Sequence, residues 1–252
     1  GPRGAHPKEH IRSPSIKEFE SWQEAACGLV AMITIAPELH GAICYLREVA
    51  MRGVIVALGH SDASEEDIYK AADAGARLST HLGNGLAGSL PRHPNAVWAQ
   101  LAEDRLSASL ILDGHHLPKS TAQVMIRAKG TERVVLVSDS VKFAGMKPGP
   151  YKSSIGGDVK VSSDGRVSIS GTQFLAGSGV SLLDVVGNFS SFTGLPFFDG
   201  IAMATRNPAH FLKRSFDLKP GHRADFILFD LDHDAGIAQP RDIIFGGERV
   251  IR

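Results

Sequence analysis

Histidine and carboxylate side chains recur at nearly constant intervals along the first half of the chain. Glu38 precedes His60 by 22 residues, His60 precedes His81 by 21, and His116 precedes Asp139 by 23. Imidazole and carboxylate groups are ligands that suit Zn²⁺ and similar divalent ions. Such an ion lowers the pKa of its bound water to about 7, and a carboxylate that does not bind the ion can accept the proton. The spacing therefore favours a metal site that activates water.

The elements that must position these side chains are alternating strands and helices. Strands are predicted at residues 32–36, 54–58, 77–80, 107–112 and 134–137, and helices at 41–51, 64–75 and 119–129. Strand–helix–strand units at this spacing indicate a parallel sheet with right-handed crossovers. The carboxyl ends of such strands carry the active site in α/β barrels and open α/β sheets. The candidate residues therefore meet at one rim, and they are Glu38, His60, His81, His115, His116 and Asp139.

Each of these residues has a simpler interpretation when taken singly. A lone histidine after a strand is more often a turn or core residue, by about three to one. Glu38 could cap the helix that follows it. The shared position after successive strands favours a site. The histidines that lack this placement fit surface or capping roles, and they are His6, His10, His40, His93, His210, His222 and His233.

The pattern changes after Asp139. Residues 151–169 contain Gly156-Gly157 and Ser163-Asp164-Gly165, which are turn signals and predict β-hairpins. Two helices are predicted at 181–193 and 198–211, followed by strands at 224–230 and 242–250. No helix separates these last strands, so they should pair antiparallel, outside the parallel sheet.

Length and composition exclude several classes of protein. The 252 residues suit one α/β barrel, and 43% hydrophobic and 21% charged residues exclude wholesale disorder. The 27 Lys and Arg balance 27 Asp and Glu, which leaves no charge footprint for nucleic acid or an anionic membrane. No apolar run approaches the roughly 20 residues that span a bilayer, and the first residues are not a signal peptide. The two cysteines favour a reducing cytoplasm.

Short motifs follow the predicted strands in a fixed order. They are Gly59-His60-Ser61-Asp62-Ala63, Thr80-His81-Leu82-Gly83-Asn84-Gly85, Asp113-Gly114-His115-His116 and Leu136-Val137-Ser138-Asp139. Others are Gly4-Ala5-His6, Leu175-Ala176-Gly177-Ser178 and residues 34–38, 203–209 and 221–225. In this order and spacing the chain resembles the N-acetylglucosamine-6-phosphate deacetylases of the amidohydrolase superfamily. The resemblance covers nearly the whole chain.

The resemblance implies roles for individual residues. His60 and His81 would be ligands of a divalent metal, expected to be Zn²⁺ with one ion per subunit. Asp139 would accept the proton of the attacking water and later protonate the amine. His116 would polarise the acetamide carbonyl. The other implied substrate-binding residues are Ala5, His6, Asn84, Gly85, Asp113, Leu175, Ala176 and Gly177.

Arg92 lies eleven residues after the second ligand histidine, where the resemblance places an arginine that binds the sugar phosphate. A guanidinium suits a phosphate dianion. In the family this arginine can come from a neighbouring subunit, which implies a homodimer. The alternative for Arg92 taken alone is a solvated loop charge, at about even odds.

The implied fold is a TIM-like (β/α)₈ barrel, of which only five strand-end signatures are present. Residues 1–215 are expected to form a partial barrel with a β-hairpin insert near 150–170, and residues 216–252 strands of a small β-sandwich domain. The family's carboxylate metal ligand in an EGP segment and the HxH of the first barrel strand have no counterpart here. The chain is therefore expected to be N-terminally truncated, without the first three barrel strands.

Gly83 and Gly85 replace the larger residues of the family's THLFNAM motif. They loosen the loop that would grip the sugar, which affects the substrate more than the reaction. Ser140 replaces the usual alanine after Asp139, which is a small change. The leading hypothesis is deacetylation of N-acetylglucosamine 6-phosphate, or a close N-acetylated amino-sugar phosphate, in amino-sugar catabolism. The alternatives are an amidohydrolase that opens a cyclic amide and an inactive truncated homologue that holds metal poorly through two histidines.

Overall fold

A computed structural model of the chain describes residues 2–153, 157–214, 218–232 and 236–250. The first half forms a parallel sheet in which the strands follow their order in the sequence. Its strands are β1 (Met32–Ile35), β2 (Ile55–Leu58), β3 (Ala76–Ser79), β4 (Ser107–Leu110) and β5 (Val134–Leu136). The structure confirms the five predicted strands to within two residues at each end. It also confirms that they are parallel.

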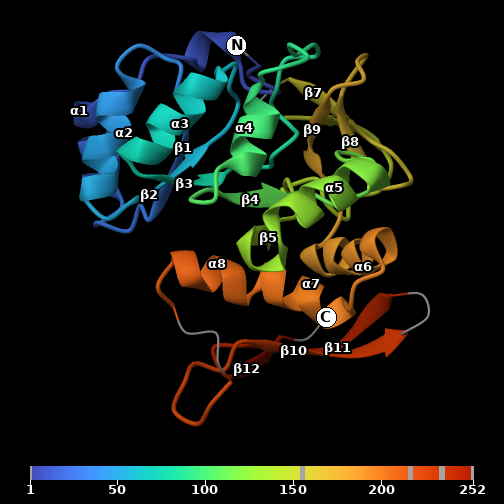
Figure 1. Ribbon diagram of the computed structural model, residues 1–252. Coiled ribbons are helices and arrows are strands. Elements are labelled where there is room, and N and C mark those ends of the chain that lie inside the picture. The colour runs from blue at the N-terminus through green and yellow to red at the C-terminus, as the bar shows by residue number, and fades with distance from the viewer. Residues whose placement is uncertain (1, 154–156, 215–217, 233–235, 251–252) are drawn as a thin grey trace.

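Helices connect the parallel strands and cover the sheet (Figure 1). Three were predicted: α2 (Ala42–Met51), α3 (Glu65–Ala74) and α5 (Lys119–Lys129). Ser64 and Asp67 form a capping box at the start of α3, and Gly75 ends that helix at a φ of 116°. The sequence analysis missed α1 (Ile16–Ala25), α4 (Ala96–Ala102) and the short 3₁₀ turns η1 (Lys8–His10) and η2 (Thr131–Arg133). Phe19 is the one buried residue of α1, so its apolar stripe is weak.

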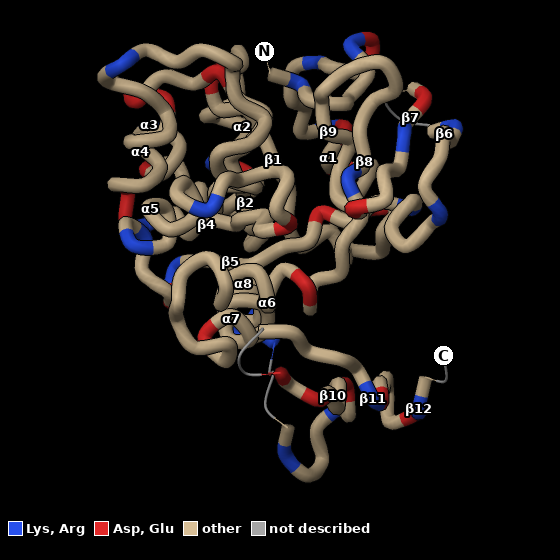
Figure 2. The backbone as a smooth tube through the Cα atoms, turned by 90° about the vertical axis from the view of Figure 1, so that its right-hand side faces the viewer, with Lys and Arg blue, Asp and Glu red and all other residues tan. Residues whose placement is uncertain are grey.

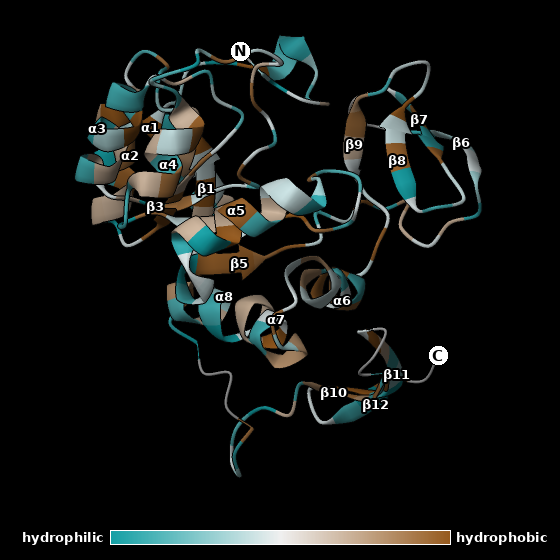
Figure 3. Cartoon of the chain, turned by 45° about the vertical axis from the view of Figure 1, so that its right-hand side comes forward, coloured by the Kyte–Doolittle hydropathy of each residue, from teal (hydrophilic) through white to brown (hydrophobic). Residues whose placement is uncertain are grey.

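Two apolar clusters hold the helices against the sheet. One joins α2 and α3 to β2 through buried side chains such as Leu46, Leu58 and Ile68. The other joins β4 and β5 to α5 and to later helices through Leu110, Leu136 and other residues. In Figure 3 hydrophobic residues dominate β5. All three residues of this strand are buried, as expected of a parallel strand that is covered on both faces.

The insert after β5 is a four-stranded antiparallel meander. Its strands are β6 (Gly149–Lys152), β7 (Asp158–Val161), β8 (Arg166–Ile169) and β9 (Leu175–Ser178). The predicted hairpins are confirmed, although Gly156 of the predicted turn lies outside the described residues. β9 was not predicted as a strand. An isolated parallel bridge between Ser140 and Ser178 joins this insert to the end of β5.

Three helices follow the insert: α6 (Leu182–Thr193), α7 (Phe197–Ala204) and α8 (Arg206–Phe211). The single helix predicted at 198–211 is wrong, because Thr205 leaves the helical conformation with φ −129° and ψ −68°. Pro208 occupies the third position of α8, where its missing N–H has no partner within a helix. The break at Thr205 therefore places Pro208 in the first turn of a new helix, where a proline is tolerated.

The chain ends in a second antiparallel sheet of β10 (Phe226–Asp232), β11 (Ile237–Phe245) and β12 (Glu248–Val250). The antiparallel pairing is confirmed, but β11 begins five residues earlier than predicted. Figure 1 shows this sheet beneath α6–α8. Phe229, Leu231 and Ala238 pack against the cluster that includes residues of α6 and α7. No helix among the described residues is long and apolar enough to cross a membrane.

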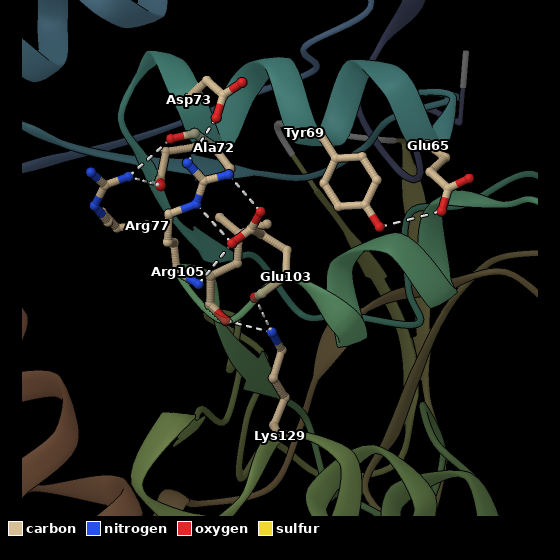
Figure 4. A network of polar contacts seen from close by, with 10 residues as sticks. Glu65, Tyr69, Ala72, Asp73, Arg77, Glu103, Arg105 and Lys129 are labelled. Atoms are coloured by element: carbon tan, nitrogen blue, oxygen red, sulfur yellow. Dashed lines mark hydrogen bonds and ion pairs between the residues drawn. The ribbon is translucent and has the colours of Figure 1, made fainter.

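A buried lysine joins the end of α5 to the segment between α4 and β4. Lys129, at the end of α5 and 1% exposed, donates to the carbonyl oxygens of Glu103 and Leu106 at 2.7 and 2.6 Å (Figure 4). Burial lowers the pKa of Lys129 to about 8. Arg105 bridges Glu103 and Asp73 in the same network, and its hydrogen bond lowers the pKa of Glu103 to about 2. Elsewhere the two signs of charge are interspersed along the chain (Figure 2).

Candidate active site

The parallel sheet brings the predicted residues to the carboxyl ends of its strands. His60 follows β2, His81 follows β3, Asp113 and His116 follow β4, and Asp139 follows β5. His60, His81 and Asp139 have φ values of 50°, 34° and 52°, a left-handed conformation uncommon for residues other than glycine. Backbone strain of this kind persists only where the surroundings enforce it, and it concentrates at functional sites.

His60 and His81 face each other through their ring nitrogens. The two Nε2 atoms lie 3.0 Å apart, and the rings are nearly perpendicular. His60 Nδ1 lies 3.2 Å from the Pro2 carbonyl oxygen. Burial lowers the pKa of both rings, and each has a further histidine nearby that lowers it again. Both imidazoles are thus held in the neutral form that binds metal ions.

This pair fits two positions in the coordination sphere of a divalent ion. Two nitrogens bound to one tetrahedral Zn²⁺ lie roughly 3.3 Å apart, close to the separation seen here. The side-chain Nδ1 of His81 is buried without a hydrogen-bond partner. Within the described part of the chain, no three His, Cys, Asp or Glu residues converge as a complete metal site. The described residues therefore offer two neighbouring imidazole nitrogens to a metal ion at this point of the rim.

Backbone contacts hold the loop of His81. The N–H of His81 donates to Ser109 Oγ at 2.7 Å, and that hydroxyl donates to the Ser79 carbonyl oxygen. Thr34 and Thr80 join the ends of β1 and β3 through their hydroxyls at 2.9 Å. Ser109 is buried on β4, where the sequence showed no chemical motif. Sequence reasoning missed these supports because they depend on strand register.

His116 is oriented by Asp113. Its Nδ1 lies 2.7 Å from Asp113 Oδ2, and the two side chains are 7% and 1% exposed. Asp113 Oδ1 also accepts the backbone N–H groups of His115 and His116. Burial alone raises the pKa of Asp113, but these hydrogen bonds overcome it and lower the pKa to about 2. Asp113 is thus ionised, and it fixes a proton on Nδ1 so that Nε2 of His116 is turned to other partners.

Asp139 is exposed at the rim beside the histidines. Partial desolvation by its surroundings raises its pKa, while the nearby His116 and His60 lower it. A carboxyl group beside a pair of imidazoles is suited to accept a proton and to return it. Its backbone oxygen accepts the N–H of Ser178 from β9 at 2.9 Å.

Other predicted substrate residues lie around this pair. The His6 ring is 4.9 Å from that of His60, edge to face. Ala5 follows Gly4, where an added Cβ would lie 2.9 Å from His60 Cε1. Asn84 Nδ2 is buried without a hydrogen-bond partner, and Gly85 lies so close that an added Cβ would be 2.9 Å from His60 Nδ1. The cavity beside Asn84 measures about 10 Å³, which leaves room for little more than one water molecule.

The insert reaches the rim through β9, which contains Leu175, Ala176 and Gly177. A Cβ at Gly177 would lie 2.3 Å from Val141 Cγ1 and 3.0 Å from the Asp139 carbonyl oxygen. The turn between β7 and β8 also touches the site loop, since His115 Nε2 lies 3.1 Å from the Asp164 carbonyl oxygen. The hairpin insert therefore contacts both Asp139 and the loop that carries His116.

Two residues lie differently from the expectation. Glu38 does not cap α2, because Gly41 is the N-cap residue of that helix and no side chain caps it. The Glu38 carboxylate instead binds Ser61 and Asp62, directly after His60. Arg92 is exposed on the loop before α4, and its guanidinium forms no hydrogen bond or ion pair with the described residues.

Comparison with known proteins identifies the family. A model of the amidohydrolase family matches residues 8–250. The chain belongs to the amidohydrolase family. This amidohydrolase is 32% identical over 232 residues to an N-acetylglucosamine-6-phosphate deacetylase of Bacillus subtilis, a match that covers 91% of this chain and 58% of the relative. It is 34% identical over 232 residues to an N-acetylgalactosamine-6-phosphate deacetylase of a Shewanella species, again with 91% and 58% coverage.

Solved structures give the same fold for this amidohydrolase. N-acetyl-D-glucosamine-6-phosphate deacetylase of Mycobacterium smegmatis superposes with a TM-score of 0.87 at 31% identity, over 98% of this chain and 65% of that one. A mutant of that enzyme was solved in complex with N-acetyl-D-glucosamine-6-phosphate. The N-acetylglucosamine-6-phosphate deacetylase of Thermotoga maritima gives a TM-score of 0.84 at 31% identity. The chain spans 58% of the length of the first curated relatives it matches. The family match and the solved structures confirm the expected amidohydrolase barrel architecture.

Proposed function

We propose that this chain is the catalytic part of an amino-sugar-phosphate deacetylase, which hydrolyses N-acetylglucosamine 6-phosphate to glucosamine 6-phosphate and acetate. The observation that carries the proposal is the convergence of His60, His81, His116 and Asp139 at one rim. Relatives named for this reaction in bacteria and animals support it. Amino-sugar catabolism is the process that such a reaction serves.

The residues of the rim divide the work of amide hydrolysis. Asp139 accepts a proton from the attacking water and returns it to the amine nitrogen as the C–N bond breaks. When protonated, His116 can donate its Nε2–H to the acetamide carbonyl oxygen, because Asp113 holds its other nitrogen at 2.7 Å. Asn84 has a buried, unpartnered amide to offer a polar ligand. His6 and Ala5 would border the same site.

His60 and His81 would hold the divalent metal, for which we propose Zn²⁺ with one ion per subunit. A bound divalent ion supplies Lewis-acid activation of water and of the carbonyl. The neutral imidazole nitrogens at 3.0 Å support this assignment. The matching test is metal analysis of the purified chain: near-stoichiometric zinc in the wild type and a loss in His60→Ala or His81→Ala.

A specific observation also favours the galacto epimer of the sugar. Two relatives at 34% and 35% identity are N-acetylgalactosamine-6-phosphate deacetylases, against 32% for the Bacillus subtilis glucosamine enzyme. The epimers differ only in the configuration of one ring hydroxyl. Gly83 and Gly85 give the loop beside His81 little side-chain bulk with which to reject either hydroxyl. We propose the gluco substrate first and the galacto substrate as the second candidate.

The decisive experiment is acetate release from both sugar phosphates by the wild type and by Asp139→Asn. We expect Asp139→Asn to lower kcat by about 10³-fold while KM and Tm change little, because only the proton transfer is lost. The control is Asp158→Asn, the same chemical change at an exposed position of β7. Full activity of Asp139→Asn would overturn the mechanism. A metal-loaded wild type that releases no acetate would favour the inactive homologue, and turnover of a phosphate-free cyclic amide would favour the other alternative.

We propose that Arg92 binds the substrate phosphate in the partner subunit of a homodimer. Its exposed, unpaired guanidinium supports donation to another copy of the chain. Arg92→Ala should raise KM for the sugar phosphate and leave a phosphate-free analogue unaffected. Mixing Arg92→Ala with Asp139→Asn should restore activity, since one mixed site has both residues intact. A monomer in light scattering, or mixtures with no recovery, would contradict this arrangement.

Several coarser assignments complete the proposal. We assign the protein to the cytoplasm, which the two exposed free cysteines Cys27 and Cys44 support. Small-molecule sugar phosphate is the proposed partner, without nucleic acid or membrane. We also propose a partial barrel domain at residues 1–215 and a small β domain at 216–252. The boundary itself lies at residues 215–217, outside the described residues.

A further inference from the structure

Glu38 connects two strand ends of the site. It follows β1, yet both of its carboxylate oxygens bind residues that follow β2. Oε2 accepts the hydroxyl of Ser61 at 2.7 Å, and Oε1 accepts the backbone N–H of Asp62 at 2.7 Å. Ser61 is 6% exposed, so the hydroxyl contact is shielded from water. Charge-assisted hydrogen bonds of this length are among the strong ones.

The loop held by Glu38 is the one that carries His60. Ser61 follows His60 directly, and its N–H donates to the Gly85 carbonyl oxygen in the loop after His81. Its hydroxyl oxygen also accepts the N–H of Ala63 at 3.0 Å. Three contacts on Ser61 thus fix the backbone next to His60, whose own φ of 50° is unfavourable.

We propose that Glu38 is a positioning residue that holds the His60 ring against the His81 ring. The carboxylate clamps Ser61 and Asp62, the clamp enforces the left-handed backbone of His60, and that backbone brings His60 Nε2 to 3.0 Å from His81 Nε2. Glu38 touches neither ring, so it acts only through the loop. The consequence for metal affinity rests on the proposed function, whereas the ring geometry does not.

The chemistry of the clamp calls for a carboxylate. Both partners of Glu38 are donors, and a carboxylate offers an acceptor to each. Glutamine has the same shape but only one amide oxygen, so one donor would meet an NH₂ group. Aspartate keeps both acceptors on a side chain that is one methylene shorter. The series Glu38→Gln and Glu38→Asp therefore separates the loss of an acceptor from a loss of reach.

The test reads the rings directly by NMR of the imidazole signals in the metal-free full chain, followed by calorimetric titration with Zn²⁺ alone. We expect Glu38→Gln to shift the His60 and His81 signals and leave that of His116 in place. Zn²⁺ affinity should fall by about 10- to 100-fold, the usual cost of losing an outer support of a ligand. Glu38→Asp should recover part of both. Glu132→Gln, the same change on an exposed residue of η2, is the matched control and should alter neither.

A second variant keeps the proposal testable if Glu38→Gln does not fold. Ser61→Ala removes one arm of the clamp with little change in volume, and it should shift the same two ring signals. The effects of Glu38→Gln and Ser61→Ala on Zn²⁺ affinity should be less than additive, because both break one contact. Unmoved His60 and His81 signals in either folded variant would overturn the proposal. Shifted signals in a chain that neither binds Zn²⁺ nor releases acetate would instead overturn the proposed function alone.

Discussion

The parallel sheet and the antiparallel sheets of this chain differ in burial and in what they contribute to chemistry. Strands β2, β4 and β5 are buried along nearly their whole length, whereas β10 and β12 are largely exposed or half-buried. His60, His81, His116 and Asp139 all follow strands of the parallel sheet. The antiparallel insert reaches the rim mainly through backbone atoms, at Ser178 and Asp164.

The difference shows how buried strands serve a polar site. A parallel strand covered on both faces cannot shift without exposing apolar side chains, so its last residue has a fixed place. Polar side chains that directly follow such strands are therefore held in fixed positions as well. An antiparallel sheet with one solvent-exposed face loses less free energy when its strands shift slightly. Here the antiparallel insert only supports the rim. Four predictions test this contrast, from the largest effect to the smallest.

The first prediction compares equal truncations in the two regions. Leu110→Ala in β4, which is 0% exposed, should lower the free energy of unfolding by about 2–5 kcal/mol through lost burial and a residual cavity. Leu228→Ala in β10, which is 51% exposed, should cost no more than about 0.5 kcal/mol. Urea unfolding of both variants measures the difference. Equal costs would mean that the parallel sheet is not the better-packed region.

The second prediction uses the buried lysine of the parallel region. Burial lowers the pKa of Lys129 to about 8 from 10.5, so between these values the unfolded chain binds more protons than the folded one. The free energy of unfolding should therefore increase by about 3 kcal/mol as the pH rises from 8 to 10.5, which means that the folded state becomes more stable. Below pH 8 the cost of burying the charge is fully present.

The measurement is the stability difference between wild type and Lys129→Met across this pH range. The free energy of unfolding of the wild type minus that of Lys129→Met should increase with pH, because the variant lacks the titrating group. Lys160→Met, at an exposed position of β7 in the insert, retains Lys129, so its stability should change with pH as that of the wild type does. A pH-independent difference between wild type and Lys129→Met would show that Lys129 is charged to the same extent in both states.

The third prediction concerns the place where the insert touches the site. Gly177→Ala and Gly171→Ala both add a Cβ at a left-handed φ, of 82° and 77°, which costs about 1 kcal/mol in each. Only Gly177→Ala also collides with Val141 and the Asp139 carbonyl oxygen, which should add about 2 kcal/mol. Thermal unfolding gives both costs. The proposed deacetylase activity should fall in Gly177→Ala and persist in Gly171→Ala. Equal activities in the two variants would mean that β9 does not support Asp139.

The fourth prediction is a contrast that should vanish. Ser64 caps α3 beside the parallel sheet, and Ser181 caps α6 after the insert, each in a capping box with an aspartate three residues on. Alanine at either position should cost about 1 kcal/mol, because both boxes are at the surface. Chemical denaturation of the two variants tests this. A clearly larger loss in one of them would show that the regions differ in their helix starts and not only in strand burial.

Much of the parallel region could be predicted because its signals are local. Apolar runs such as residues 54–58, and the N-cap serine of α3, specify strands and helices over a few residues. The meeting of the candidate residues at one rim could be predicted from topology alone, since the carboxyl ends of parallel strands lie at one edge of the sheet. Helix α1 was missed because its burial rests on Phe19, and the break at Thr205 because the sequence pattern continues through it.

The fine structure of the site could not be predicted because it depends on distant partners. Glu38 contacts residues 23 and 24 positions later in the chain, and nothing in its neighbourhood shows this. The orphaned amide of Asn84 appears only when the loop is folded. The exposure of Arg92 likewise depends on the path of its loop. Residue types predicted the chemistry, and the tertiary structure decided which residues support it.

The left-handed backbone at His60, His81 and Asp139 has a consequence for laboratory evolution. Glycine adopts this conformation without the penalty of about 1–2 kcal/mol that a side chain incurs, although it loses more entropy on folding. A mutant library sorted only for heat resistance could therefore enrich glycine at these three positions. Each such variant would lack a side chain to which the proposed function assigns a role. Screens on this scaffold need a selection for turnover alongside the one for heat.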